Sequence, residues 1–243
     1  MTAPAAALLD ELDERGIKLY ISDGRLRAVA PKDAISGDLR QLIERHRAEL
    51  MDLLGHGDGP APSAFPLVTE RLVLRPLRAG DEVDVLAYRG RAEVFGYLDD
   101  NPLTPATIGR YVAMMAQFAS LDHPEDRLLL GAELDGHVIG DIALSRGRAR
   151  HAQGEIGWVF HPDHSGHGYA TEAARAALRL GFERVRLHRI CARLDPRNAA
   201  SVRLCERLGM RPEGLLRDER WLKGDWADVA VYACLDHEWR ARG

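Results

Sequence analysis

A glycine-rich bend lies between a strand-like and a helix-like segment in the C-terminal half of the chain. The run HPDHSGHGYATEAARAALRLGFERV leaves the strand-like segment at Pro162, passes through Gly166 and Gly168, and becomes helical from about Ala170. Unpaired amides at a helix start attract anions, and glycine lets the backbone wrap a phosphate because it has no Cβ. The bend could therefore hold a pyrophosphate, although an ordinary strand-to-helix turn could have the same composition.

Side chains suited to proton transfer lie on both sides of this bend. Asp141 and Glu155 stand in the strand-like segments before it, and Asp195 follows the next such segment. The helix-like run after Asp195 carries Ser201 and Cys205. A carboxylate can accept a proton, and a thiol, with a reference pKa of about 8.5, can donate one. Residues of these types can take part in acid–base chemistry, but their types and positions alone assign a role to none of them.

Composition excludes several classes of function. The formal net charge of -4 gives no overall basic field, so nucleic-acid binding is not expected as the main role. The N-terminus MTAPAAALLDELDERG has no basic leader, and no apolar run is long enough to span a bilayer, so we expect a cytoplasmic protein without a membrane partner. Cys191, Cys205 and Cys234 are widely spaced, which predicts free thiols, no disulfide and no metal site.

Alternating apolar residues predict the strands that position the bend. VTERLVLRPL forms one strand, and Asp81 is expected to cap a helix that starts at Glu82. RLLLGAELDGHVIGDIAL predicts a hairpin about Asp135 and Gly136, and the runs GEIGWVFHP and RICARLDP predict further strands. The bend therefore joins a sheet to a helix.

A smaller unit precedes this framework. Ala5 to Glu14 follows a helical period, IKLYISDGRLRAVAP alternates about the turn Asp23-Gly24, and DLRQLIERHRAELMDLL returns to a helical period. This helix, hairpin and helix have little core of their own. LGHGDGPAPSAFP has no apolar period and predicts a tether. We therefore divide the chain into a small domain at 1–56, a linker at 57–65 and a large domain at 66–243.

Three motifs resemble one acetyltransferase branch. TERLVLRPL, EIGWVFHPDHSGHGYATEA and LDPRNAASVRLCERLGM stand in the order and at the separations of the RimJ/RimL branch of the GNAT superfamily of N-acetyltransferases, over about residues 67–239. The resemblance implies an α+β fold: a mixed, mostly antiparallel sheet flanked by helices, in which the fourth and fifth strands splay apart to admit acetyl-CoA as co-substrate. It implies that the cofactor is bound by Trp158, Val159, Phe160, Gly166, His167, Gly168, Tyr169, Ala170, Thr171 and Asn198.

Ser165 departs from the pattern of this branch, which has Gln or Arg at that position. One side-chain contact to phosphate is therefore missing. Most of the expected cradle is backbone, so we expect weaker affinity for acetyl-CoA rather than none. His164, His167 or Arg175 could compensate, although each also suits a solvated surface.

The resemblance also implies catalytic roles. Glu155 stands on the strand where the superfamily often has a carboxylate that deprotonates the amine through water, with Asp141 and Asp195 as rivals. Ser201 belongs to the family motif N-x-x-S, and Cys205 occupies the position of a tyrosine that protonates the leaving thiolate in many relatives. Acetyl transfer can be direct, so no covalent enzyme intermediate is expected. A helix cap at Ser201, and a core or nucleophilic Cys205, are the alternatives.

The small domain resembles the N-terminal docking domains of the TubC type. The resemblance covers about residues 4–54 and implies a place on a non-ribosomal peptide or polyketide assembly line, where the hairpin captures the acidic C-terminal tail of an upstream protein. A free strand edge can accept an extended peptide, and Lys18, Arg25 and Arg27 are the candidates to bind its charges, unless they are only a solvated face. The small core also allows a homodimer through this domain.

Together the two resemblances predict a recruited enzyme. We expect an N-acetyltransferase that is brought to an assembly line and acetylates an amine of a carrier-bound intermediate or of the product. One alternative is a free-standing protein or antibiotic N-acetyltransferase. The other is a non-catalytic adaptor with a degenerate GNAT fold, which Ser165 and Cys205 would favour.

Overall fold

A computed structural model describes residues 4–22, 25–31, 34–55, 65–119, 121, 126–147 and 152–242. The predicted hairpin turn Asp23-Gly24 lies outside the described residues, and so does the predicted linker apart from its last residue, Phe65.

The N-terminal unit contains a two-stranded sheet and three helices: α1 (Pro4–Glu14), β1 (Lys18–Ser22), β2 (Arg25–Val29), α2 (Gly37–Arg45) and α3 (Arg47–Gly55). Leu12, Leu19 and Leu50 belong to its small buried cluster. The single helix expected from Asp38 onward is instead divided in two. The backbone leaves the regular helical conformation at His46, which has φ -98° and ψ 14° and ends α2.

The larger unit is built on an eight-stranded sheet with strand order β3-β4-β5-β6-β7-β8-β10-β9. All neighbouring strands are antiparallel except β7 and β8. Its elements are β3 (Leu67–Val68), β4 (Val73–Pro76), α4 (Glu82–Arg89), the 3-10 helix η2 (Ala92–Tyr97), α5 (Ile108–Met115), β5 (Arg127–Leu134), β6 (His137–Arg146), β7 (Gln153–Phe160), the 3-10 turn η4 (Pro162–His164), α6 (Tyr169–Arg179), the π-helical turn η5 (Leu180–Arg184), β8 (Arg189–Leu194), α7 (Ala199–Arg207), β9 (Arg211–Leu222), β10 (Asp225–Leu235) and α8 (Asp236–Arg240).

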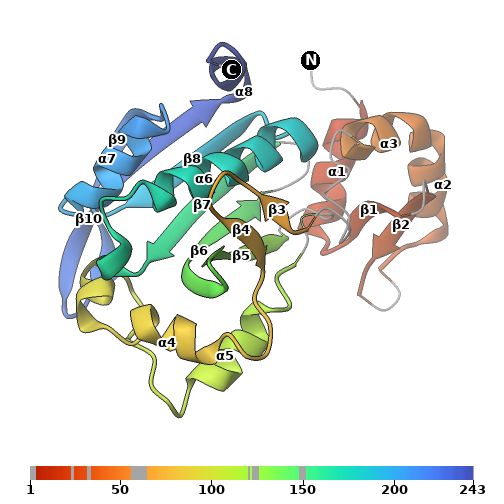
Figure 1. Cartoon of the computed structure of the whole chain (residues 1–243). Coiled ribbons are helices and arrows are strands. Elements are labelled where there is room, and N and C mark those ends of the chain that lie inside the picture. The colour runs from red at the N-terminus through yellow and green to blue at the C-terminus, as the bar shows by residue number, and fades with distance from the viewer. Residues whose placement is uncertain are drawn as a thin grey trace.

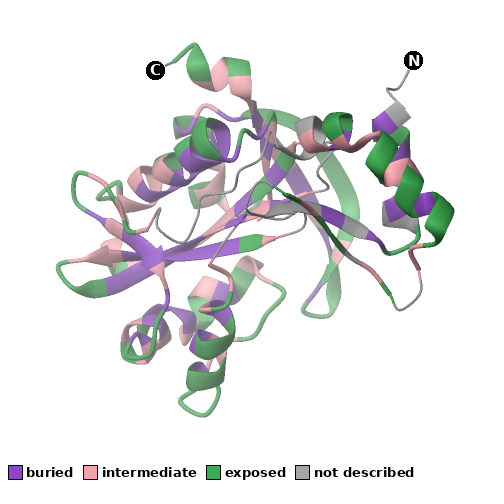
Figure 2. Ribbon diagram, turned by 90° about the vertical axis from the view of Figure 1, so that its right-hand side faces the viewer, coloured by how far each residue is buried: buried purple, intermediate pink, exposed green. Residues whose placement is uncertain are grey.

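Helices cover both faces of this sheet (Figure 1). On one face Ile156 of β7 belongs to a buried cluster with residues of α6 and α7, such as Ala174 and Leu204. On the other face, Leu129 of β5 belongs to a cluster with α4 and α5 residues, such as Tyr88. Buried residues accordingly run along the central strands in Figure 2. The mixed, mostly antiparallel α+β architecture predicted from the motifs is confirmed.

Local turn chemistry explains one connection but not another. Asp135 and Gly136 both have positive φ, 50° and 86°, as a two-residue hairpin turn requires. Asp81 stands before α4 as predicted, but the predicted side-chain cap is wrong. Its carboxylate instead accepts two hydrogen bonds from Arg75, at 2.8 and 2.9 Å, and the amide of Arg78 at 2.8 Å. The guanidinium of Arg75 is mostly buried and needs that counterion.

The two parallel strands separate after a short pairing. Gln153, Gly154 and Glu155 of β7 pair with Arg189, Ile190 and Cys191 of β8, and the pairing ends there. From Ile156 to Phe160, β7 remains paired only with β6. This is the splay expected between the fourth and fifth strands, counted from β4.

Candidate functional site

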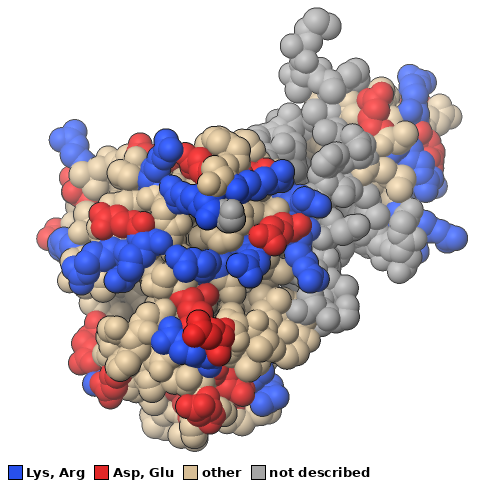
Figure 3. All heavy atoms as spheres, turned by 45° about the horizontal axis from the view of Figure 1, so that its top comes forward, with Lys and Arg blue, Asp and Glu red and all other residues tan. Residues whose placement is uncertain are grey.

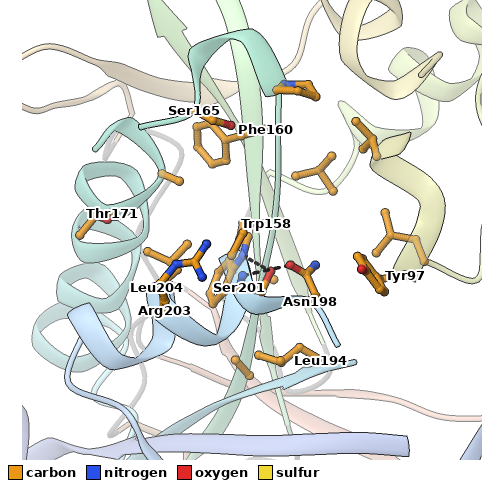
Figure 4. A pocket seen from close by; sticks show the side chains of 18 of the residues that line it. Tyr97, Trp158, Phe160, Ser165, Thr171, Leu194, Asn198, Ser201, Arg203 and Leu204 are labelled. Atoms are coloured by element: carbon orange, nitrogen blue, oxygen red, sulfur yellow. Dashed lines mark hydrogen bonds between the residues drawn. The ribbon is translucent and has the colours of Figure 1, made fainter. Parts of the chain in front are cut away.

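A cavity of about 670 Å³ opens where β7 and β8 diverge. Its walls come from both strands, the start of α6, one side of α7 and the helix η2 (Figure 4). Ten of the residues predicted from the sequence line it: Trp158, Val159, Phe160, Gly166, Gly168, Tyr169, Ala170, Thr171, Asn198 and Ser201. His167, Glu155 and Cys205 are not among the lining residues.

The start of α6 presents a row of free amides. Gly166 and Gly168 have left-handed φ angles of 84° and 82°. Within the described chain, the amides of residues 166–171 donate no hydrogen bond, and the first amide that does so belongs to Glu172, which donates to the Gly168 carbonyl at 3.0 Å. Free N–H groups at a helix start favour an anion. This bend therefore fits the diphosphate of coenzyme A.

Arg71, on the loop before β4, braces this bend. It donates to the His167 carbonyl at 3.0 Å and to Glu172 at 2.8 Å, and its guanidinium lies 4.6 Å from the centre of the Tyr169 ring. Burial alone would raise the pKa of Glu172, but hydrogen bonds from Thr69 and Arg71 outweigh burial and lower it. The bend is thus held in shape by protein contacts, which reduces the ordering that a ligand would require.

The open edge of β7 offers main-chain groups to an extended ligand. The amide of His161 donates to Ile139 of β6 at 2.9 Å. Because amide directions alternate along a strand, the amides of Trp158 and Phe160 face the gap, whereas the amide of Val159 faces β6. Trp158 and Phe160 can therefore pair with a pantetheine arm, while Val159 borders the cavity without offering its amide.

Asn198 caps α7, Ser201 lies in its first turn, and both line the cavity. The side-chain oxygen of Asn198 accepts the amide of Ser201 at 3.1 Å. The hydroxyl oxygen of Ser201 accepts the indole N–H of Trp158 at 3.2 Å, which joins α7 to β7 across the splay. Its own hydroxyl proton remains available to a ligand.

The three candidate carboxylates lie in different environments. Asp141 is 1% exposed and is bound by Arg89 and Tyr88, so it is not accessible to a substrate. Asp195 is 4% exposed, and hydrogen bonds from Arg197 to both of its oxygens lower its pKa, which weakens it as a base.

Glu155 is exposed on β7, opposite Cys191, at the last paired position before the splay. Its carboxylate has no hydrogen-bond partner in the part of the chain that the structure describes. Of the three candidate carboxylates, Glu155 is therefore the one that can accept a proton, although it lies outside the cavity lining.

The structure does not bring Cys205 to the cavity. Its side chain is 0% exposed within the main core, and burial raises the pKa of its thiol to about 12. Such a thiol is a poor proton donor near neutral pH. The three cysteines are free, and no cluster of His, Cys, Asp and Glu suited to a metal ion occurs among the described residues.

Several lining residues were not predicted from the sequence. Glu93 and Tyr97 come from η2, and the ring of Tyr97 faces Asn198 across the cavity in Figure 4. Lys223, in the β9–β10 turn, donates to the Phe95 carbonyl and so ties η2 to that hairpin. Other lining residues missed by sequence reasoning carry positive charge: Arg193, Arg203, Arg207 and Arg220.

Comparison with known proteins agrees with the fold and identifies the family. A model of the acetyltransferase (GNAT) domain matches residues 71–211, and a model of the TubC N-terminal docking domain matches residues 6–55. The uncharacterised N-acetyltransferase YnaD of Bacillus subtilis is 32% identical over 178 residues, and the match covers 71% of this chain and 98% of that protein. YnaD therefore has almost nothing to match the rest of this chain.

Solved structures show the same architecture. A GNAT-family acetyltransferase from Bacillus anthracis superposes with a TM-score of 0.63 at 31% identity, over 71% of this chain and 99% of that one. Spermidine N-acetyltransferase from Vibrio cholerae, solved in complex with CoA and spermine, shares the fold with a TM-score of 0.60 at 22% identity, over 71% of this chain and 99% of that one.

None of the helices in the described ranges is both long and apolar enough to cross a bilayer. The chain belongs to the GNAT family of acetyltransferases and carries a TubC-type docking domain within residues 6–55.

Proposed function

We propose that this chain is an acetyl-CoA-dependent N-acetyltransferase that its docking domain recruits to a non-ribosomal peptide or polyketide assembly line. There it acetylates an amine of a carrier-bound intermediate or of the product. The observation that carries this proposal is the presence of a splayed-strand cavity with free amides at residues 166–171 in the same chain as a docking hairpin. Bound acetyl-CoA would supply the activated acetyl group.

The residues that line the cavity, together with Glu155 outside the lining, have distinct roles in this proposal. The amides of residues 166–171 hold the diphosphate, while Trp158, Phe160 and Asn198 hold the extended arm. Glu155 takes the proton of the attacking amine through water, and Ser201 holds a donor proton at Oγ. An α-amine, with a pKa of about 8, needs little help from Glu155, whereas an alkylamine at about 10.4 needs more.

Replacing Cys205 with alanine is expected to leave turnover unchanged to within about twofold, because the thiol is buried and weakly acidic. Loss of its buried volume should lower the free energy of unfolding by about 1 kcal/mol. Ser201→Ala should slow turnover at least about tenfold. The rate at which free CoA is released, with an aminoacyl-loaded carrier protein as acceptor, measures the turnover of both variants. A rate in Cys205→Ala as low as in Ser201→Ala would restore Cys205 as the proton donor.

The hairpin supports recruitment through its free edge. Within the described residues, β2 has no partner strand other than β1, and Arg25 and Arg27 are exposed on it. These two positions share one face of β2, because they are two residues apart. Lys18 pairs with Val29 and so occupies a backbone position on the same face, although its side chain lies outside the part of the chain that the structure describes. An extended acidic peptide can add to this edge while these cations bind its carboxylates.

Full-length protein carrying Arg25→Glu and Arg27→Glu should bind an acidic C-terminal peptide of the upstream assembly-line protein at least about tenfold more weakly, because like charges then face each other. Arg40→Glu with Arg45→Glu makes the same charge change on exposed positions of α2, and this control should bind within about twofold of the wild type. Fluorescence anisotropy with the labelled peptide measures both. Equal loss in the two variants would show that only net charge matters.

The same variants separate recruited from free-standing activity. Mass spectrometry should detect an increment of about 42 Da on an aminoacyl-loaded carrier protein, as expected for an acetylated amine. The variant Arg25→Glu, Arg27→Glu should lose most of this signal when the carrier protein ends in the acidic tail. With an aminoacyl thioester that has no tail, the same variant should give the full wild-type signal. Identical rates on both substrates would favour the free-standing enzyme. A wild-type protein that binds no acetyl-CoA at millimolar concentration would favour the adaptor.

A further inference from the structure

Two arginines of α7 line the cavity without a protein partner. Arg203 and Arg207 are both exposed and both border the cavity. Neither side chain makes an ion pair or a hydrogen bond with any other described residue. The other two arginines of the lining are engaged: Arg193 with Glu219 at 2.7 Å, and Arg220 with Asp99 at 3.5 Å.

The placement of this pair favours an anion between the two side chains. Arg203 and Arg207 stand four residues apart on α7, so they share one face of the helix and repel each other. Glu206 stands three residues after Arg203, yet the two do not pair. In Figure 4 the guanidinium of Arg203 instead extends from α7 toward the space beside α6. A phosphate bound between the two side chains would offset this repulsion.

This pair borders the same cavity as the amide row of α6. Ser165, which stands where the family pattern has Gln or Arg, lines that cavity with only a neutral hydroxyl. Of the compensating residues considered from the sequence, His164 lines the cavity, whereas His167 and Arg175 do not. Figure 3 shows a band of Lys and Arg side chains across one face of the large domain. The cations that can take the place of a Gln or Arg side chain at Ser165 therefore come from α7.

We infer that Arg203 and Arg207 bind the phosphates at the nucleotide end of coenzyme A, including the 3′-phosphate, and so supply the phosphate binding that the short side chain of Ser165 cannot provide. This inference rests on the proposed use of acetyl-CoA. Guanidinium groups suit it because their planar N–H groups can bind two oxygens of one phosphate, and exposed side chains can close on a ligand from outside the cavity. Acetyl-CoA affinity should consequently fall as salt rises, because salt screens exposed charges.

Calorimetry with CoA alone tests the assignment without any acceptor. Arg203→Gln with Arg207→Gln should weaken CoA binding at least about tenfold and flatten its salt dependence. Arg179→Gln with Arg184→Gln is the matched control, since these exposed residues carry the same charge but do not line the cavity. The control should bind within about twofold of the wild type. A decrease of less than twofold in the α7 variant would overturn the inference.

Dephospho-CoA, which lacks the 3′-phosphate, identifies the group that is bound. Wild-type protein should bind it more weakly than CoA, and the α7 variant should bind the two nearly equally. An α7 variant that prefers CoA as strongly as the wild type does would place the 3′-phosphate elsewhere and overturn the assignment.

The compensation for Ser165 has its own test. Ser165→Arg should restore most of the CoA affinity of the α7 variant but add less than about twofold to the wild type, because side chains that serve the same phosphates are not additive. An equal gain in both backgrounds would show that Ser165 and the α7 pair act independently. Absence of CoA binding by the wild type itself would refute the proposed function. Wild-type affinity for CoA in the Arg203→Gln, Arg207→Gln variant would refute only this inference.

Discussion

Gly166→Val should weaken acetyl-CoA binding at least about 100-fold while the protein remains folded. Gly166 has a φ of 84°, a left-handed conformation that costs an L-residue about 1–2 kcal/mol, and valine adopts it less readily than most. If the backbone relaxes, the amides of the bend turn away from the bound anion. Charge-assisted hydrogen bonds contribute about 1.5–3 kcal/mol each, so losing two accounts for the predicted decrease.

Gly136→Val is a closely matched control for this change. Gly136 has a φ of 86° in the turn between β5 and β6, and an added Cβ would meet nothing within 4 Å at either glycine. The two variants should therefore lose similar stability, which thermal unfolding measures. Only Gly166→Val should lose affinity in a titration with acetyl-CoA. Tight binding by Gly166→Val would mean that the bend is not the diphosphate site, and the proposed function would lose its main support.

Patterns within short segments predicted much of this molecule. The bend from Pro162 to Thr171 could be assigned because a strand end, two glycines and a helix start are contiguous, and the free amides follow from that order. The turn at Asp135 and Gly136 was also predictable, since positive φ at both positions is a local preference. The family motif then placed Asn198 and Ser201 on the cavity wall.

Contacts between distant segments were not predictable in this way. Arg71 braces the bend from almost a hundred positions away, and no periodicity links the two segments. Asp81 could be recognised as a residue before a helix, but its pairing with Arg75 depends on how β4 is buried. Cys205 occupies the position of a proposed acid in the motif, yet its burial depends on how α7 packs against the sheet.

The arginines of α7 illustrate the same limit at the cofactor site. A helical period shows that Arg203 and Arg207 share a face, but not which face borders the cavity. The sequence instead points to the histidines of the bend and to Arg175, which are closer to Ser165 along the chain. The cavity-lining arginines without a side-chain partner among the described residues belong to α7, which approaches Ser165 only in the folded protein.

The buried ion pair between α4 and β6 leads to the largest expected effect on stability. Arg89 donates to Asp141 through Nε at 2.8 Å and through Nη2 at 2.6 Å, and Tyr88 donates to the same carboxylate at 2.8 Å. Burial alone would lower the pKa of Arg89, but the charge of Asp141 and these hydrogen bonds outweigh burial and raise it. The guanidinium also lies 5.1 Å from the centre of the Tyr111 ring. Arg89 therefore stays charged in the core and depends on Asp141 as its counterion.

Asp141→Ala should lower the free energy of unfolding by about 3–5 kcal/mol, because it leaves that charge buried and unpaired. Asp163→Ala breaks an exposed pair with Arg91 and should cost less than about 1 kcal/mol. Urea denaturation of both variants measures the difference. Combining Asp141→Leu with Arg89→Met removes both charges and should recover much of the stability. If Asp141→Ala cost no more than Asp163→Ala, the pair would not anchor α4 to β6.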